Sequence, residues 1–217
     1  MIADLEDFER AGHLDYYPLA GADKASKEAI RPVIALLREA FGKGFGPEEF
    51  DWLLDAIEPD KQKQQVINQQ LDKSVNTVLT SSMGRLFDAV AAIAGLGAYN
   101  HFEAQLPMAL EAVADNNVTD TYSFEIKDGK EQLLLDLRRT IKLIVADRRR
   151  DVPAAKIAAK FHNMLANSLC SVAEHIRQKS GIEKVALSGG VFCNRFLSER
   201  LIEALKQAGF SVSFNVQ

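Results

Sequence analysis

The string Ser188-Gly189-Gly190 is the part of this sequence best suited to bind a ligand. It lies between an apolar run at 185–187, expected to be a strand, and a helix expected over 195–207. Backbone N–H groups and a helix N-terminus converge at such a junction, and two glycines let a ligand approach the backbone without a Cβ in the way. Asn194 is placed to cap the helix or to bind the ligand. A tight strand-to-helix connection without a ligand explains these residues equally well.

Histidine and cysteine offer weaker candidates for chemistry. The four histidines include no pair three or four residues apart, so we expect no metal site within this chain. His162 is expected to make a hydrogen bond in helix packing. Cys170 and Cys193 lie outside any CxxC pair, which fits a reducing cytosol. We expect Cys193, close to the glycine string, to be a small buried residue and not a nucleophile.

The overall composition argues against two classes of partner. The chain has 217 residues, 47% of them hydrophobic, and a formal net charge of -4. No positive field is available to attract nucleic acid or an anionic membrane. The first residues are acidic where a signal peptide is basic, and no run approaches the ~20 apolar residues of a membrane span. We therefore expect a cytoplasmic protein that binds neither nucleic acid nor membrane.

Apolar periodicity predicts a helix-rich α/β fold. Helices are expected over 25–41, where Pro32 marks a start or a kink, and over 47–57, 61–71, 84–97 and 154–179. Gly42 ends the first of these helices, and residues 80–82 offer caps for the fourth. Strands are expected at 122–126, at 185–187 and at 210–216. The last two strands and the helix between them form a β-loop-α-β unit, which predicts a parallel pair.

Three strings in this sequence resemble one family closely. They are SSMGRLFDAVAAIAGL at 81–96, VPAAKIAAKFHNML at 152–165 and VALSGGVFCNRFLSER at 185–200, and a looser similarity covers 4–41. The chain resembles the C-terminal, Kae1-like region of the HypF-type carbamoyltransferase of [NiFe]-hydrogenase maturation, in the actin-like and sugar-kinase-like ATPase superfamily. The resemblance implies a single unit over 1–217, one lobe of that fold with a helical insertion and a small mixed sheet. Residues 1–183 would be its mainly helical part and 184–217 its nucleotide-binding part.

The resemblance also implies a set of nucleotide-binding residues. Asp88 would accept hydrogen bonds from ribose hydroxyls, since a carboxylate on the first turns of a helix is fixed in direction. Ala22 and Ala104 stand where the family usually has glycine, which weakens the contact if a positive φ or close backbone approach is needed. No catalytic residue is assigned. The implied set is Gly84, Asp88, Glu103 and Gln105 on the nucleoside side, and Ser188, Gly189, Gly190 and Asn194 on the phosphate and base side.

A complete enzyme of this family would activate carbamoyl phosphate with ATP and pass the carbamoyl group to a cysteine of a HypE-type maturation partner. This chain would hold ATP or carbamoyl adenylate, and the upstream domains of the same enzyme would be its other partners. The family's metal is held by upstream histidines and a downstream aspartate, neither of which is in this sequence. We therefore expect a metal ion only in the complete enzyme, and no turnover by this chain alone.

Two other classes of function remain open at this point. A related superfamily kinase or a threonylcarbamoyl-type transferase would share the fold and the nucleoside contacts, and its substrate would distinguish it. A non-catalytic helical docking module is the third interpretation, for which Ala104 in place of glycine is mild support. Capture of a partner without nucleotide binding would favour that module.

Overall fold

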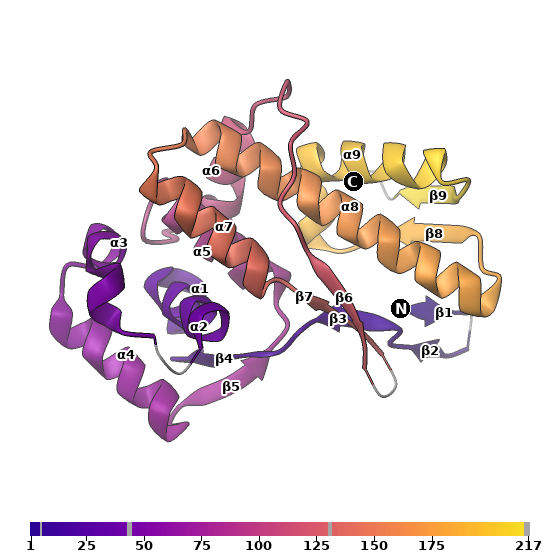
Figure 1. The fold of residues 1–217 in the computed structure, drawn as a ribbon. Coiled ribbons are helices and arrows are strands. Elements are labelled where there is room, and N and C mark those ends of the chain that lie inside the picture. The colour runs from indigo at the N-terminus through magenta and orange to yellow at the C-terminus, as the bar shows by residue number, and fades with distance from the viewer. Residues whose placement is uncertain (5, 43–44, 130–131, 215–217) are drawn as a thin grey trace.

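The structure is a computed structural model that describes residues 1–4, 6–42, 45–129 and 132–214. Figure 1 shows α1 to α4 with β4 and β5 at one end, α9, β8 and β9 at the other, and β3, β6 and β7 between them. None of the described helices is both long and apolar enough to cross a membrane. In chain order the elements are β1 (Ile2–Ala3), β2 (Phe8–Glu9), β3 (Gly12–Leu14), β4 (Tyr17–Ala20), α1 (Lys24–Lys27), α2 (Ile30–Phe41), the 3-10 helix η1 (Pro47–Phe50), α3 (Asp51–Ile57), α4 (Lys61–Lys73), β5 (Thr77–Thr80), α5 (Met83–Ile93), α6 (Gln105–Val113), β6 (Glu125–Asp128), β7 (Leu133–Asp136), α7 (Arg138–Arg149), α8 (Ala154–Ser180), β8 (Lys184–Leu187), the 3-10 helix η2 (Gly190–Cys193), α9 (Arg195–Gln207) and β9 (Ser211–Phe214).

Helix α5 lies inside the core. Residues 86–93 are all buried, and the helix packs against α2, α6 and α7. Because it is enclosed after its first turn, its apolar residues are not confined to one stripe. Ser82 caps it, since the Ser82 hydroxyl accepts a hydrogen bond from the Arg85 N–H at 3.3 Å. The predicted helix and its capping position are confirmed, but the helix ends at Ile93, four residues before the predicted end at Gly97.

The strands form small sheets, as the fold class requires. β3, β7 and β6 make a mixed sheet in which β3 pairs parallel to β7 and β6 pairs antiparallel to it. β4 pairs antiparallel to β5, and β1 to β2. β8 and β9 form the predicted parallel pair, with α9 as the crossover helix between them. The helix-rich α/β class and the β-loop-α-β unit are therefore both confirmed.

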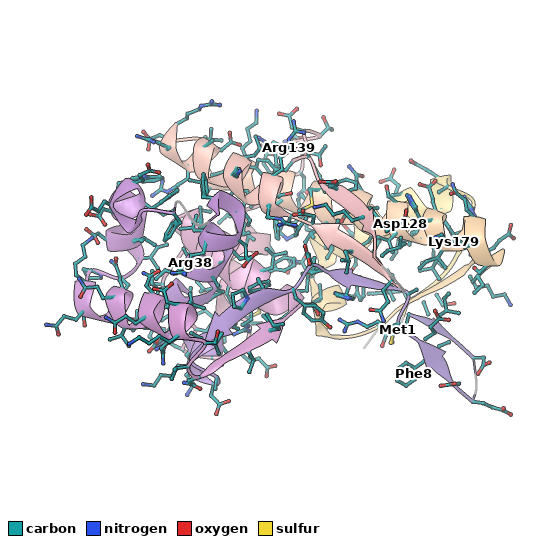
Figure 2. All side chains as sticks on the ribbon, turned by 60° about the horizontal axis from the view of Figure 1, so that its bottom comes forward. Met1, Phe8, Arg38, Asp128, Arg139 and Lys179 are labelled. Atoms are coloured by element: carbon teal, nitrogen blue, oxygen red, sulfur yellow. The ribbon has the colours of Figure 1, made fainter. Side chains whose placement is uncertain are left out.

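Helix α8, of 27 residues, connects the two ends of the molecule. It ends at Gly181, whose φ of 72° is left-handed, as a glycine stop predicts. Near this end Lys179 reaches Asp128 at the end of β6, and Figure 2 shows the two side chains close together. Their 3.2 Å ion pair is exposed, so its contribution to stability is small.

Several predicted boundaries were wrong. The helix expected over 25–41 is two helices, because Glu28 leaves the helical conformation and forms an isolated bridge with Tyr99. Pro32 was expected to mark either a helix start or a kink. It lies in the first turn of α2, so the helix start is confirmed. The strand expected at 122–126 begins only at Glu125, because the Tyr122 hydroxyl turns inward to Asp147 at 2.8 Å. β9 spans 211–214, and residues 215–216 of the strand expected there lie outside the described residues.

The strands β1 to β5 and β7, and the helix α6, were missed entirely, and no range was predicted for α7. These strands have between two and four residues each, too few for an alternating pattern to stand out. They add a sheet component to residues 1–183, whose helices nevertheless account for most of that segment.

Ala22 and Ala104 both have left-handed backbone conformations, with φ of 45° and 60°. Alanine at such a position pays a steric cost that glycine avoids. Ala104 is the residue directly before α6, so its conformation sets the direction in which that helix leaves the preceding loop.

Ala104→Gly is expected to raise the free energy of unfolding by about 0.5 to 1 kcal/mol, because glycine removes the Cβ strain of the left-handed conformation. Ala112→Gly is the control at an exposed position of the same helix, and it should lower the free energy of unfolding by about 1 kcal/mol. Urea unfolding followed by circular dichroism measures both. A less stable Ala104→Gly variant would contradict the left-handed assignment.

Candidate functional site

The glycine loop, residues 188–190, is exposed at the end of β8. Gly189 has a φ of 102°, which favours glycine, and a Cβ added at Gly189 or Gly190 would meet no heavy atom within 4 Å. The first backbone hydrogen bond of η2 runs from the Phe192 N–H to the Gly189 carbonyl at 3.0 Å. The N–H groups of Gly190 and Val191 precede it and have no acceptor among the described residues. Neither donor is therefore engaged within the described part of the chain.

A hollow of about 690 Å³ lies beside the glycine loop, lined also by η2, the first turns of α9 and Phe214 of β9. Arg195 lies at its edge and pairs with Glu199 at 2.6 Å. Cys193 also lines it and is exposed. The prediction of a buried cysteine was wrong, because η2 is a short surface turn with no buried residue.

Asn194 caps α9. Its Oδ1 accepts a hydrogen bond from the Leu197 N–H at 2.8 Å, and its Nδ2 donates to Nε2 of His162 at 2.9 Å. The side chain is buried, with 8% of the residue exposed. Of the two roles considered for Asn194, the structure shows the helix cap, and both ends of the amide are already in use.

His162 supports Asn194 from α8. It has no exposed surface, and its Nδ1 donates to the Ala158 carbonyl at 2.7 Å, which leaves Nε2 to accept from Asn194. Its ring meets the Phe87 ring edge-on, with centroids 5.5 Å apart. Burial lowers the pKa of His162 to about 4, so the ring is neutral near pH 7. The predicted packing hydrogen bond is confirmed.

Glu111 of α6 occupies the N-terminus of α9. Its Oε1 accepts hydrogen bonds from the N–H groups of Arg195 at 2.6 Å and of Phe196 at 3.4 Å. With Leu197 bonded to Asn194, the first N–H donors of α9 all have acceptors within the protein. The donors open to a ligand are therefore those of Gly190 and Val191, not those of α9. Sequence reasoning missed Glu111, which is 84 residues from Arg195 and carries no local signal.

The other predicted set gathers around the start of α5. Asp88 has no exposed surface. Its Oδ1 accepts from the Asn100 amide at 2.9 Å, and its Oδ2 lies 3.0 Å from the guanidinium of Arg85. Burial raises the pKa of Asp88, while the hydrogen bond from Asn100 and the charge of Arg85 oppose that effect. The carboxylate thus faces the protein interior, not solvent.

Asn100 holds residues 100–105, called the 100–105 loop below, in place through hydrogen bonds. Its Oδ1 accepts from the Leu106 N–H, and its amide also donates to the Ser26 carbonyl, at 2.8 and 2.9 Å. Gln105 closes the loop, since its Oε1 accepts from the His101 N–H at 2.8 Å. Glu103 is exposed on this loop, and Gly84 is half-buried in the first turn of α5. The structure therefore ties Asp88 to the loop that carries Glu103 and Gln105, and it places Gly84 one turn before Asp88 on α5.

The two predicted sets lie on different elements and do not share the hollow, whose lining includes none of the first set. They are connected through the protein by α6 and by the Phe87, His162 and Asn194 side chains. In the described parts of the chain, no group of three or more histidine, cysteine, aspartate or glutamate side chains is arranged to hold a metal ion.

These features define a class of fold. A glycine loop between a parallel strand and a helix, beside a helical insertion and a small mixed sheet, is one lobe of the actin-like and sugar-kinase-like fold in its Kae1-like form. The chain belongs to the family of carbamoyltransferases with a Kae1-like domain, as its second subdomain, and the model of that family matches residues 1–217.

The relatives are longer proteins. Carbamoyltransferase HypF of Synechocystis sp. is 37% identical over 94% of this chain and 27% of its own length. The crystal structure of full-length HypF in the phosphate- and nucleotide-bound form is 35% identical, with a TM-score of 0.89 over 98% of this chain and 27% of that one. HypF of T. kodakarensis gives a TM-score of 0.77 at 28% identity, over 95% of this chain and 27% of that one. This chain thus spans about a quarter of their length.

His162 makes stability depend on pH. Its pKa of about 4 lies below the value of about 6.5 for a free imidazole, so the unfolded state binds more protons in that interval. Stability is therefore full above about pH 6.5 and falls as the pH drops toward 4. Between pH 7.5 and 5 this one group is expected to remove about 2 kcal/mol from the free energy of unfolding.

His162→Gln should lose less stability over that pH interval, because the neutral amide still accepts from Asn194 but does not titrate. Urea unfolding at the two pH values measures the difference. His175→Gln, on the same helix, is the matched control, and it should keep the wild-type acid loss because His162 is intact. An unchanged acid loss in His162→Gln would rule out His162 as its source.

Proposed function

We propose that this chain is the nucleotide-binding part of a HypF-type carbamoyltransferase and holds ATP or carbamoyl adenylate. The observation that carries the proposal is the open glycine loop, which lies beside a hollow and has two N–H donors without an acceptor among the described residues. The full-length HypF structure with phosphate and nucleotide bound supports it, since this chain matches that protein at a TM-score of 0.89.

The glycine loop fits a phosphate group. The space around Gly189 and Gly190 is free of heavy atoms within 4 Å of an added Cβ, so oxygen atoms can approach the backbone. The N–H groups of Gly190 and Val191 would donate to them, and the exposed Ser188 is close enough in sequence to add a hydroxyl. Asn194 would act indirectly, by fixing α9 behind the loop.

The nucleoside side fits less directly. Glu103 is exposed and can accept hydrogen bonds from ribose hydroxyls, whereas Asp88 is buried. Its Oδ1 accepts from Asn100, and its Oδ2 lies 3.0 Å from the Arg85 guanidinium but accepts no hydrogen bond within the described residues. We therefore assign the first ribose contact to Glu103. A contact to Asp88 requires the Asn100 side chain to move away, which exposes the carboxylate. Gly84 and Gln105 would shape the same wall, Gln105 through its hold on the 100–105 loop.

In the longer enzyme, the role of this chain would be to position the reactant. The upstream domains would form carbamoyl adenylate from carbamoyl phosphate and ATP. A cysteine thiolate of a hydrogenase maturation partner would then attack the carbamoyl carbon, forming a C–S bond as the C–O bond to AMP breaks. A metal ion held elsewhere in that enzyme would polarise the carbamoyl and phosphate oxygens.

Gly190→Ala is expected to weaken ATP binding about tenfold, because the new methyl group lies where a phosphate must approach the backbone. Its free energy of unfolding should stay within about 0.5 kcal/mol of the wild type, since the methyl meets no other atom. Isothermal titration calorimetry with ATP measures the affinity.

Gly181→Ala is the control, with the opposite expected result: lower stability and unchanged ATP binding. Its φ of 72° makes alanine strained, so this variant should lose about 1 kcal/mol of stability and bind ATP like the wild type. If Gly190→Ala also binds ATP like the wild type, the phosphate does not lie on the glycine loop.

A further inference from the structure

Helix α6 joins the two predicted binding regions. Its N-terminal end carries the 100–105 loop, where the Asn100 Oδ1 accepts from the Leu106 N–H and the Asn100 amide holds Asp88. Nine residues of helix span roughly 13 Å, which takes the chain from this loop to α9. One short, rigid element therefore has the nucleoside residues at one end and the helix behind the glycine loop at the other.

The C-terminal end of α6 and the segment after it bind α9 in two places. Glu111 accepts from the N–H groups of Arg195 and Phe196 at the start of α9. One turn further along α9, Arg200 donates to the carbonyl of Asn116, just after α6, at 3.2 Å. The guanidinium of Arg200 also stacks over the Phe196 ring, 3.9 Å from its centroid.

The hydrogen bonds that the Glu111 carboxylate accepts are the strongest of these contacts on chemical grounds. A carboxylate at a helix N-terminus gains both a charge-assisted hydrogen bond and the favourable end of the helix dipole. Its partner, the Arg195 amide, belongs to the residue that follows Asn194 and η2. A displacement of α6 relative to α9 would therefore reach the glycine loop through Asn194 and η2.

We propose that Glu111 is a positioning residue, which fixes the distance between the 100–105 loop and the glycine loop so that one nucleotide can contact both at once. The proposal rests on the nucleotide-binding function proposed above. Its physical consequence is specific. ATP, which spans both loops, depends on Glu111, whereas adenosine and inorganic tripolyphosphate, each of which contacts one loop, do not.

The test measures the affinities of ATP, adenosine and tripolyphosphate for the wild type, Glu111→Ala and Glu111→Gln. Glu111→Ala should weaken ATP about tenfold and change the affinities of adenosine and tripolyphosphate by less than about twofold. Glu111→Gln keeps an acceptor oxygen and should recover most of the ATP affinity. Glu203→Ala removes an exposed carboxylate from α9 without uncapping it, and it should bind ATP like the wild type.

Arg195→Pro tests the same bond from the other side. Proline suits the first position of a helix and lacks the N–H that Glu111 accepts, and the extended conformation of Asn194, with ψ of 106°, is compatible with a following proline. Arg195→Ala removes the same side chain but keeps the N–H. The Pro variant should bind ATP more weakly than the Ala variant, and adding Glu111→Ala to it should cost less than in the wild type.

The outcomes separate the two proposals. If the wild type does not bind ATP, the proposed function fails, and the role of Glu111 fails with it. If the wild type binds ATP and Glu111→Ala binds it equally or more tightly, the function stands and the positioning role is overturned. Tighter binding would mean that the carboxylate competes with phosphate for the α9 N-terminus. Equal weakening of all three ligands would reduce Glu111 to a general stabiliser of the fold, which also overturns the proposal.

Discussion

The N–H groups at the start of α9 need acceptors, and the way they obtain them determines the geometry of this site. Asn194 and Glu111 supply those acceptors from two different elements, and the buried, neutral His162 holds Asn194 in place. The strong anion-binding position of a helix N-terminus is thereby filled from within the protein. Near this helix end, the described residues leave donors for a ligand one turn earlier, in the glycine loop, where an added Cβ would meet no heavy atom within 4 Å.

The same principle governs the region around Asp88. A buried carboxylate needs partners, and it finds them in Asn100 and Arg85. Asn100 in turn ties the 100–105 loop to the carbonyl of Ser26, so one amide connects the interior of α5 to two surface segments. The residues that would meet a nucleotide are thus set by polar contacts beneath them. The apolar core holds the helices together, and these few buried polar groups fix the positions of the surface segments above them.

Local signals in the sequence predicted much of this structure. The bounds of α9, the glycine stop of α8 and the Ser82 cap of α5 all follow from residues within one turn. The glycine loop was found for the same reason. The sequence could not show that Asp88 is enclosed, because that depends on Asn100 and Arg85 closing over it after folding. Glu111 left no trace either, since a solvated glutamate and a cap for a helix 84 residues away look identical in a sequence. The short strands escaped because their pairing partners, not their own residues, define them.

The left-handed alanines bear on how this site opens. Ala22 precedes α1 and Ala104 precedes α6. Asn100 links these two helices, because it donates to the Ser26 carbonyl of α1 and accepts from the Leu106 N–H of α6. If an alanine leaves the left-handed region when these contacts open, a strain of about 1 kcal/mol is released, which corresponds to an open population about fivefold larger. Hydrogen exchange at the 100–105 loop would follow such local opening. The buried carboxylate of Asp88 is thus covered by segments that begin at two strained alanines, Ala22 and Ala104.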